Sequence, residues 1–250
     1  MTTTLTIRPQ VGVVIPSYGD SGPTCWCLSQ FNSVRVDTIC LVVDVPDEES
    51  MNAIRRAAME CGIHVHIIKN QFRSGVGAAL RQGLDYLTSI GCEIAVIMAG
   101  NGKDDPAEIS RLVDPILSGE CDYVQGSRYM PGGRAVHTPL FRGIFSRLYP
   151  SIWTIVTGKK CTDVTNGFRA YKLSILTNRK IKVHQKWLDG YSLEYYLHYK
   201  ILTCGYKMKE VPVSKKYPFR GKGGYSHIQP LNDWWPIISP LIFLYARVRE

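Results

Sequence analysis

The sequence predicts an α/β fold in which helices cover both faces of a mostly parallel sheet. Short, β-branched and almost wholly apolar runs recur through the first half of the chain, as in strands buried on both faces. Longer amphipathic runs separate them, and this strand–helix alternation is typical of a doubly wound sheet. Polar residues gather just after the apolar runs. In such sheets ligands bind at that place, beyond the carboxyl ends of the strands.

Residues 1–127 are expected to alternate between strands and helices. The strands are predicted at 11–16, 38–45, 63–68, 93–99 and 121–127, and the helices at 47–62, 74–91 and 105–117. Pro16 is expected to end the first strand. The last of these helices has a start signal, with Asp105 as the cap, Pro106 at the first helical position and Glu108 completing a capping box.

The second half is less regular than the first. Residues 128–228 hold Gly- and Pro-rich loops, an amphipathic stretch at 186–207 and a strand-like stretch at 207–217. We expect residues 1–228 to form a single domain. The apolar tail, 229–250, is too short to span a bilayer. We expect this tail to pack on the protein's own core, and the alternative is a helix lying on a membrane surface.

The composition is that of an ordinary soluble globular chain, with 45% hydrophobic and 20% charged residues. No apolar run is long enough to span a bilayer, and the N-terminal residues lack the pattern of a signal peptide. The 8 cysteines include no C-x-x-C pair, which argues against a zinc site and a disulfide scaffold. We therefore expect a cytoplasmic protein, with the surface of the cytoplasmic membrane as the alternative location.

The net charge of +9 is unevenly distributed along the chain. Residues 1–120 hold 9 Lys and Arg against 14 Asp and Glu, whereas residues 121–250 hold 21 against 7. A basic half indicates an anionic partner, which can be a nucleic acid, an anionic lipid or a phosphorylated substrate. No nucleic-acid-binding motif accompanies the charge, so we expect no nucleic acid among the partners.

Residues that follow the first strands suit a nucleotide. Tyr18 offers a stacking face and Asp20 offers a carboxylate. Asp44 ends the second strand, where a buried carboxylate is costly unless it accepts hydrogen bonds. Either a nucleobase N–H or a loop of the protein can supply them. Before the next helix, the glycine-rich turn in RSGVGAALRQG lets backbone N–H groups approach an anion.

A series of motifs extends this interpretation over roughly residues 11–228. In chain order they are VVIPSYGD, FRSGVGAALRQG, MAGNGKDDPAEI, VQGSRYMPGG, DVTNGFRAY, CGYKMKEVPV and RGKGGYSH. Together they resemble the motifs of family-2 nucleotide-sugar glycosyltransferases, close to the dolichol- and polyprenyl-phosphate sugar synthases. The resemblance implies a GT-A-type, Rossmann-like sheet that binds the nucleotide-sugar, followed by an irregular part that binds the acceptor. It also implies an inverting sugar transfer.

The motifs and the resemblance together single out candidate site residues in a donor half, 1–127, and an acceptor half, 128–228. Donor-binding residues are expected to be Pro16, Ser17, Tyr18, Asp20, Asp44, Arg73, Gly75 and Asn101. Catalytic residues are expected to be Lys103, Arg128, Arg142 and Asp163. Acceptor- or phosphate-binding residues are expected to be Ser146, Asn166, Arg169, Asp189 and Arg220. Arginine suits this task because it is always charged and forks around phosphate oxygens.

The chain departs from the family pattern where relatives hold a metal. The family's D-x-D motif and the Gln two residues later correspond here to Ala99, Asn101 and Lys103. Asn101 is a weak, neutral ligand, so we expect protein-held Mg²⁺ or Mn²⁺ to be weak. Our hypothesis is that Lys103, helped by Arg73 and other arginines, supplies the positive charge instead. The alternatives are a metal held mainly by the donor diphosphate and Asn101, or a donor with a single phosphate.

The acceptor decides whether a general base is needed. A lipid phosphate is already anionic near neutral pH and needs none, whereas a sugar hydroxyl needs one. Asp163, Asp189 and Glu194 are the candidate bases. The basic second half favours an anionic lipid phosphate or a cell-envelope glycan as acceptor. A nucleotide-sugar-binding or partner subunit without activity remains the alternative to an enzyme.

Overall fold

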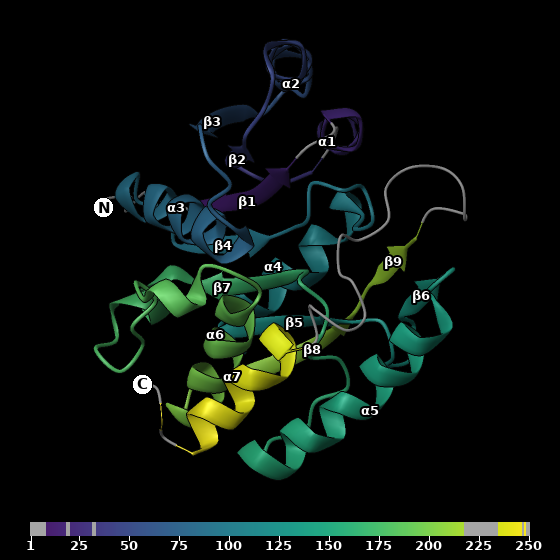
Figure 1. The fold of residues 1–250 in the computed structure, drawn as a ribbon, viewed down its shortest axis with the longest axis vertical. Helices are drawn as coiled ribbons and strands as arrows, with labels where there is room; N and C mark the ends of the chain where they lie inside the picture. Colours follow the sequence, from purple (N-terminus) through teal and green to yellow (C-terminus); the bar gives the residue numbers. More distant parts are fainter. Residues whose placement is uncertain (1–8, 19–20, 32–33, 218–234, 247, 249–250) are drawn as a thin grey trace, which may run out of the picture.

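The computed structural model describes residues 9–18, 21–31, 34–217, 235–246 and 248. Its main element is a seven-stranded sheet with strand order β3-β2-β1-β4-β7-β5-β8, and a two-stranded sheet pairs β6 with β9 (Figure 1). The elements, in which η marks a 3-10 turn, are β1 (Val11–Tyr18), α1 (Ser21–Ser29), β2 (Thr38–Asp44), α2 (Glu48–Glu60), β3 (His64–Asn70), α3 (Val76–Ser89), β4 (Ile94–Ile97), η1 (Pro106–Glu108), α4 (Ile109–Leu117), β5 (Tyr123–Ser127), β6 (Arg134–Val136), α5 (Leu140–Thr157), β7 (Arg169–Lys172), η2 (Leu173–Thr177), η3 (Lys186–Leu188), α6 (Ser192–Thr203), β8 (Met208–Pro212), β9 (Ser214–Lys216) and α7 (Trp235–Tyr245).

The sheet is mostly parallel, as the sequence predicts. β3, β2, β1 and β4 pair in parallel, and β8 pairs in parallel with β5. The exception is β7, which lies antiparallel between β4 and β5. The sequence does not predict β7, because its residues form part of the motif DVTNGFRAY and lack the long apolar run of the other strands.

Helices cover both faces of the sheet because alternate strand residues point to opposite sides. Val13 and Ile15 of β1 pack in the same cluster as residues of α1, α2 and α4. Val14, between them, packs in a second cluster with residues of α3 and α6. A smaller third cluster joins α5, α6 and α7 around Trp153. The layers are thus those of the expected doubly wound fold.

β1 continues past Pro16 to Tyr18, contrary to the prediction that the proline ends it. Pro16 pairs with Val42 of β2, and its carbonyl accepts a hydrogen bond from the Gly100 N–H at 3.3 Å. β4 ends at Ile97, before it would reach the position beside Pro16. The missing N–H of the proline therefore costs the sheet no hydrogen bond to β4.

The capping box expected at residues 105–108 is only half formed. Asp105 caps η1 through a 3.0 Å hydrogen bond from Ala107 N–H, as predicted. Glu108, however, does not bond back to the cap. Its carboxylate accepts hydrogen bonds from Ser214 N–H at 2.7 Å and from Arg111 at 3.0 Å. A tertiary partner, the first residue of β9, therefore replaces the local one.

α5 carries an exposed apolar face that the sequence analysis missed. We call the α5 apolar face the set Leu140, Phe141, Ile144, Leu148, Ile152 and Ile155, whose exposed fractions lie between 49% and 82%. The inner side of the helix instead presents Gly143, Ser146 and Pro150, together with two aromatic residues. This distribution reverses the usual amphipathic pattern, in which the large aliphatic side chains face the core.

α7 packs on the protein through one side. Ile237 and Leu241 belong to the third core cluster, and the Tyr149 hydroxyl donates to the Ile237 carbonyl at 2.8 Å. Trp235 and Tyr245 are 59% and 68% exposed. Across the described residues, no helix has both the length and the apolar character required to cross a membrane.

Candidate active site

One edge of the sheet gathers the candidate residues. β1, β2, β4 and β5 run in the same direction, so their carboxyl ends meet at this edge, and antiparallel β7 begins there. Tyr18 and Asp44 end β1 and β2, Lys103 follows β4, Arg128 follows β5, and Arg169 opens β7. Residues that are far apart in the sequence therefore share one place, as expected for this type of sheet.

Asp44 holds the loop that precedes α3. Its buried carboxylate accepts hydrogen bonds from Ser74 N–H and Oγ, both at 2.8 Å, from Gly75 N–H at 3.2 Å and from Asn70 Nδ2 at 2.8 Å. The sequence left two hydrogen-bond partners open for Asp44, a nucleobase and a loop of the protein. In the structure the partner is the protein loop. The anion that the glycine-rich turn meets is thus the protein's own carboxylate.

The first turn of α3 also has an internal partner. The N–H groups of Gly77 and Ala78 donate to the Asp189 carbonyl at 2.8 and 3.1 Å. The Asp189 carboxylate contacts Arg81 of α3 in an ion pair. Asp189 therefore lies against α3, and its predicted role in binding the acceptor stays a prediction.

The other donor-side residues lie beside the ends of β1 and β4. The Arg73 guanidinium lies over the Tyr18 ring, with Cζ 4.6 Å from the centroid, and Tyr18 is 44% exposed. Ser17 Oγ is 2.7 Å from Thr24 Oγ1, which in turn donates to the Gly100 carbonyl at 3.2 Å. Asp20 and Arg220 lie outside the described residues. Nucleoside binding by Tyr18 and its neighbours stays a prediction.

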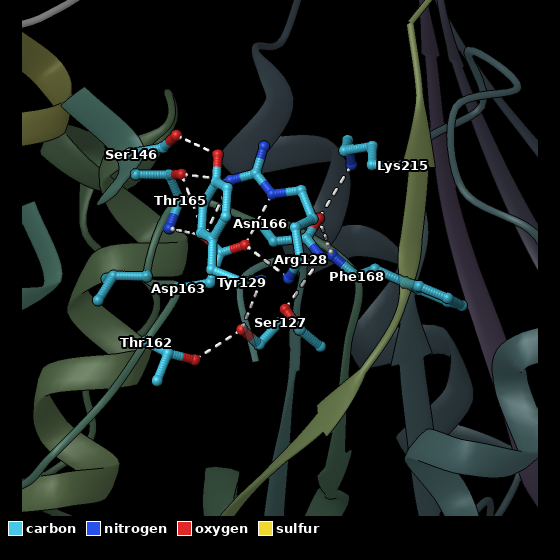
Figure 2. Close-up of polar contacts among 12 residues, drawn as sticks. Ser127, Arg128, Tyr129, Ser146, Thr162, Asp163, Thr165, Asn166, Phe168 and Lys215 are labelled. Carbon is cyan, nitrogen blue, oxygen red and sulfur yellow. Dashed lines mark hydrogen bonds and ion pairs between the residues drawn. The ribbon is translucent and has the colours of Figure 1, made fainter. Parts of the chain in front are cut away.

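Arg128 and Asp163 form a fully buried ion pair (Figure 2). Arg128 Nε lies 2.7 Å from Asp163 Oδ2, and Nη2 lies 2.8 Å from Oδ1, so the contact is bidentate. Arg128 Nη2 also donates to Thr165 Oγ1 at 2.6 Å. Burial alone would lower the pKa of Arg128, but the charge and hydrogen bonds of Asp163 raise it above its ordinary value. Asp163, a candidate base, instead positions an arginine.

Three cations contact Tyr217, and the charge of a fourth, Lys215, acts on one of them, Lys103. We call Lys103, Arg128, Arg142 and Lys215 the cationic cluster. Lys103 Nζ lies 5.3 Å and Arg142 Cζ 5.9 Å from the centroid of the Tyr217 ring. Arg128 Nη1 donates to the Tyr217 hydroxyl at 3.1 Å. Burial, followed by the positive charges of Lys215 and Arg142, lowers the pKa of Lys103 to about 8. Such a concentration of positive charge suits a phosphate ligand.

α5 brings two predicted residues to the cationic cluster. Arg142 lies over Tyr217, and Ser146 is buried with its hydroxyl hydrogen-bonded to that of Tyr129. The Tyr129 ring lies under the guanidinium of Arg128, with Cζ 5.1 Å from the centroid. The inner side of α5 therefore borders the cluster, while the α5 apolar face is exposed.

Arg169 occupies a different place from the one predicted. It is 1% exposed in the middle of the sheet, and its guanidinium donates to the carbonyls of Val164, Asn166 and Glu194 at 2.7–2.8 Å. These bonds tie the loop before β7 to α6. The phosphate-facing role predicted for Arg169 does not match this interior position, which β7 takes because it is paired on both sides.

Comparison with known proteins decides the family. The model of glycosyl transferase family 2 matches residues 13–179. This chain belongs to glycosyl transferase family 2. The glycosyltransferase is 28% identical over 212 residues to the polyprenol monophosphomannose synthase of Mycolicibacterium smegmatis, a match that covers 84% of this chain and 79% of that protein.

Further similarities agree with this assignment. The glycosyltransferase is 29% identical over 210 residues to the undecaprenyl-phosphate mannosyltransferase of Micrococcus luteus, covering 82% of this chain and 83% of that protein. The crystal structure of a mycobacterial protein matches with a TM-score of 0.59 at 17% identity, over 93% of this chain and 75% of that chain. The predicted GT-A-type fold is confirmed.

The end of β4 in this glycosyltransferase does not fit a metal ion. Asn101 Oδ1 lies 3.3 Å from the Lys103 N–H, and the neighbouring Asp104 carboxylate is bonded to Lys215 Nζ at 2.6 Å. Asp105 is used as the cap of η1. Among the residues that the structure describes, no group of three or more His, Cys, Asp or Glu could hold a metal ion. An amide next to a buried ammonium is a poor site for a hard divalent cation.

Lys215 and Tyr217 are site residues that the sequence analysis missed. Lys215 Nζ bonds to Asp104 Oδ1 at 2.6 Å and to Asn166 Oδ1 at 3.0 Å, and it is separated from Asp104 by 111 residues in sequence. Asn166 also donates to the Gly126 carbonyl at 2.9 Å, so its amide joins three segments of the site. The available signal was the basic run SKKY in a strand-like stretch.

Proposed function

We propose that this glycosyltransferase transfers a sugar, with inversion, from a nucleotide-sugar to a lipid phosphate of the polyprenyl type. The observation that carries the proposal is the two-sided character of α5. Its inner side brings Arg142 and Ser146 to the cationic cluster, whereas the α5 apolar face is exposed. A lipid phosphate has the same two parts, an anionic head and an apolar chain.

The state of Asp163 supports a phosphate acceptor over a sugar hydroxyl. A hydroxyl nucleophile needs a base, but both carboxylate oxygens of Asp163 are bonded to Arg128 and the side chain is fully buried. A phosphate monoester is already ionised near neutral pH, so it attacks without losing a proton. The names of the two mannosyl-transferring relatives, which refer to polyprenol and undecaprenyl phosphate, support the same class of acceptor.

The first experiment supplies UDP- and GDP-linked hexoses together with undecaprenyl phosphate in detergent micelles. We expect one donor to yield a lipid-linked sugar phosphate, detected by mass spectrometry. Arg142→Gln should lower kcat/KM about 100-fold, because a cation aimed at the reacting phosphates is removed. Arg56→Gln, at an exposed position of α2 far from α5 in Figure 1, is the matched control and should keep full activity.

Two other outcomes would decide against the proposal. Transfer to sugar hydroxyls but not to undecaprenyl phosphate would exclude the lipid acceptor. Binding of a nucleotide-sugar without turnover, with every acceptor, would favour the inactive binding subunit that the sequence left open.

The proposal also requires contact with a membrane surface. The exposed Lys159 and Lys160 follow directly after α5, so an anionic bilayer would match the α5 apolar face and its end in polarity and charge. Leu148→Glu should weaken sedimentation with phosphatidylglycerol vesicles at least about tenfold, since it puts a charge into the buried contact. Leu148 is 64% exposed, so the fold should be unaffected.

The matched control for this variant is Met59→Glu on α2, because Met59 is 78% exposed on a different part of the molecule. It should sediment like the wild type. Equal sedimentation of all three proteins would show that α5 does not contact the bilayer.

A further inference from the structure

The turn after β4 holds a buried ammonium group, that of Lys103. Lys103 is 4% exposed, and its Nζ faces the Tyr217 ring. It forms no ion pair with any carboxylate that the structure describes. A buried charge without a counter-ion is costly. Lys103 is therefore a buried cation for which the residues that the structure describes supply no counter-ion, and an anionic ligand would supply one.

Asp104 does not fill that role, although it is the next residue. Its Oδ1 accepts from Lys215 Nζ at 2.6 Å, and its Oδ2 accepts from Ala99 N–H at 3.3 Å. Asp104 is 1% exposed, so Lys215 cancels its charge inside the protein. The Asp104 carboxylate is thus bonded to Lys215 and not to Lys103, although its charge still acts to raise the pKa of Lys103.

The position of Lys103 also joins the two sides of the site. The turn after β4 contacts the donor side through Gly100, whose N–H donates to the Pro16 carbonyl. On the other side, Lys103 shares the Tyr217 ring with Arg142 of α5. Suppose that the nucleoside of the donor lies beside β1 and that its sugar reaches the acceptor next to α5. The diphosphate that joins them then lies between these two sides, where Lys103 is.

We propose that Lys103 is a catalytic residue that binds the donor diphosphate in place of a divalent metal ion, so that sugar transfer by this enzyme is metal-independent. This inference rests on the proposed function. Lys103 carries one positive charge where Mg²⁺ carries two. Arg142, on the same tyrosine ring, supplies further positive charge, whereas the charges of Arg128 and Lys215 are offset by Asp163 and Asp104.

The chemical step needs no proton transfer. An oxygen of the acceptor phosphate forms a bond to C1 of the sugar, while the bond from C1 to the β-phosphate oxygen breaks. The electron pair of the broken bond leaves with the nucleoside diphosphate, which gains one negative charge. Lys103 stays protonated and stabilises that charge as it develops.

The experiment measures GDP and UDP binding by calorimetry in EDTA and in Mg²⁺ or Mn²⁺. We expect the wild type to bind one of them with the same Kd, within about twofold, in all three conditions. Lys103→Met should weaken this binding at least about 30-fold, the loss expected for a charge-assisted contact. Lys103→Arg should restore binding to within about fivefold of the wild type, because it keeps the charge.

Folding and charge effects are controlled separately. Lys103→Met should melt no lower than the wild type, because it removes a buried charge that has no carboxylate partner among the described residues. Lys180→Met, at an exposed lysine in the loop after η2, should bind like the wild type. A loss of binding shared by Lys103→Met and Lys103→Arg would overturn the proposal, since the charge would then not be what matters.

The remaining outcomes distinguish this proposal from the proposed function. Binding and sugar transfer that vanish in EDTA and return with Mg²⁺ overturn the role of Lys103 but leave the glycosyl transfer intact. If Lys103→Met binds the nucleotide in EDTA with the same Kd as the wild type, the role of Lys103 is likewise overturned and the glycosyl transfer is not. Absence of binding by the wild type to both nucleotides in every condition overturns the proposed function, and this inference with it.

Discussion

Replacing Asp163 with asparagine is expected to lower the free energy of unfolding by about 3–5 kcal/mol and to abolish sugar transfer. Asp163 is fully buried and holds Arg128 through two hydrogen bonds of 2.7 and 2.8 Å. Asparagine keeps the shape but removes the charge, which leaves a buried guanidinium without a counter-ion. Urea unfolding followed by tryptophan fluorescence measures the loss, and the transfer assay measures the activity.

A double-mutant comparison separates the lost charge from lost packing. Arg128→Met combined with Asp163→Leu removes both charges, so we expect it to recover at least half of the lost stability while remaining inactive. Asp114→Asn, at an exposed position of α4, should change stability by less than about 0.5 kcal/mol. A loss below about 1 kcal/mol for Asp163→Asn would show that the pair is not desolvated as the structure indicates.

The second large effect is expected from Gly77→Ala in the first turn of α3. A Cβ at this position would lie 1.9 Å from the Leu188 carbonyl oxygen and 2.4 Å from that of Gly190. Both obstacles are backbone atoms, so the helix and the loop have to separate. Separation also breaks the bonds from Gly77 and Ala78 to the Asp189 carbonyl. We expect a loss of at least about 3 kcal/mol in the free energy of unfolding.

Gly190→Ala is the matched control, because it places the same methyl group in the loop that faces Gly77. No atom lies within 4 Å of a Cβ at Gly190, so its stability should stay within about 0.5 kcal/mol of the wild type. Similar losses for Gly77→Ala and Gly190→Ala in urea unfolding would show that α3 and the loop are not in close contact.

The sheet could be predicted where the signal was local. The strands of the first half are almost wholly apolar runs, and their alternation with helices predicts the doubly wound class of fold. β7 gave no such signal, because its position between β4 and β5 depends on pairing with both neighbours. α5 was missed for a related reason. Its inner side carries Gly143, Ser146 and Pro150, which do not look like a core-facing stripe.

The candidate site could be predicted in part. The motifs led to Lys103, Arg128 and Arg142, which the structure brings to one tyrosine. They did not decide whether Asp44 bonds to a ligand or to the protein, and they did not pair Asp163 with Arg128, because such partners depend on tertiary contacts. Lys215 shows the same limit, since its partner Asp104 is 111 residues away in sequence.

The position of β7 has a consequence for how the enzyme can move. β7 belongs to the acceptor half, yet it is hydrogen-bonded to β4 on one side and to β5 on the other. A hinge between the donor and acceptor halves would have to break one of these ladders. Closure around a substrate is therefore confined to segments that leave the sheet edge, and the sheet itself acts as a fixed platform.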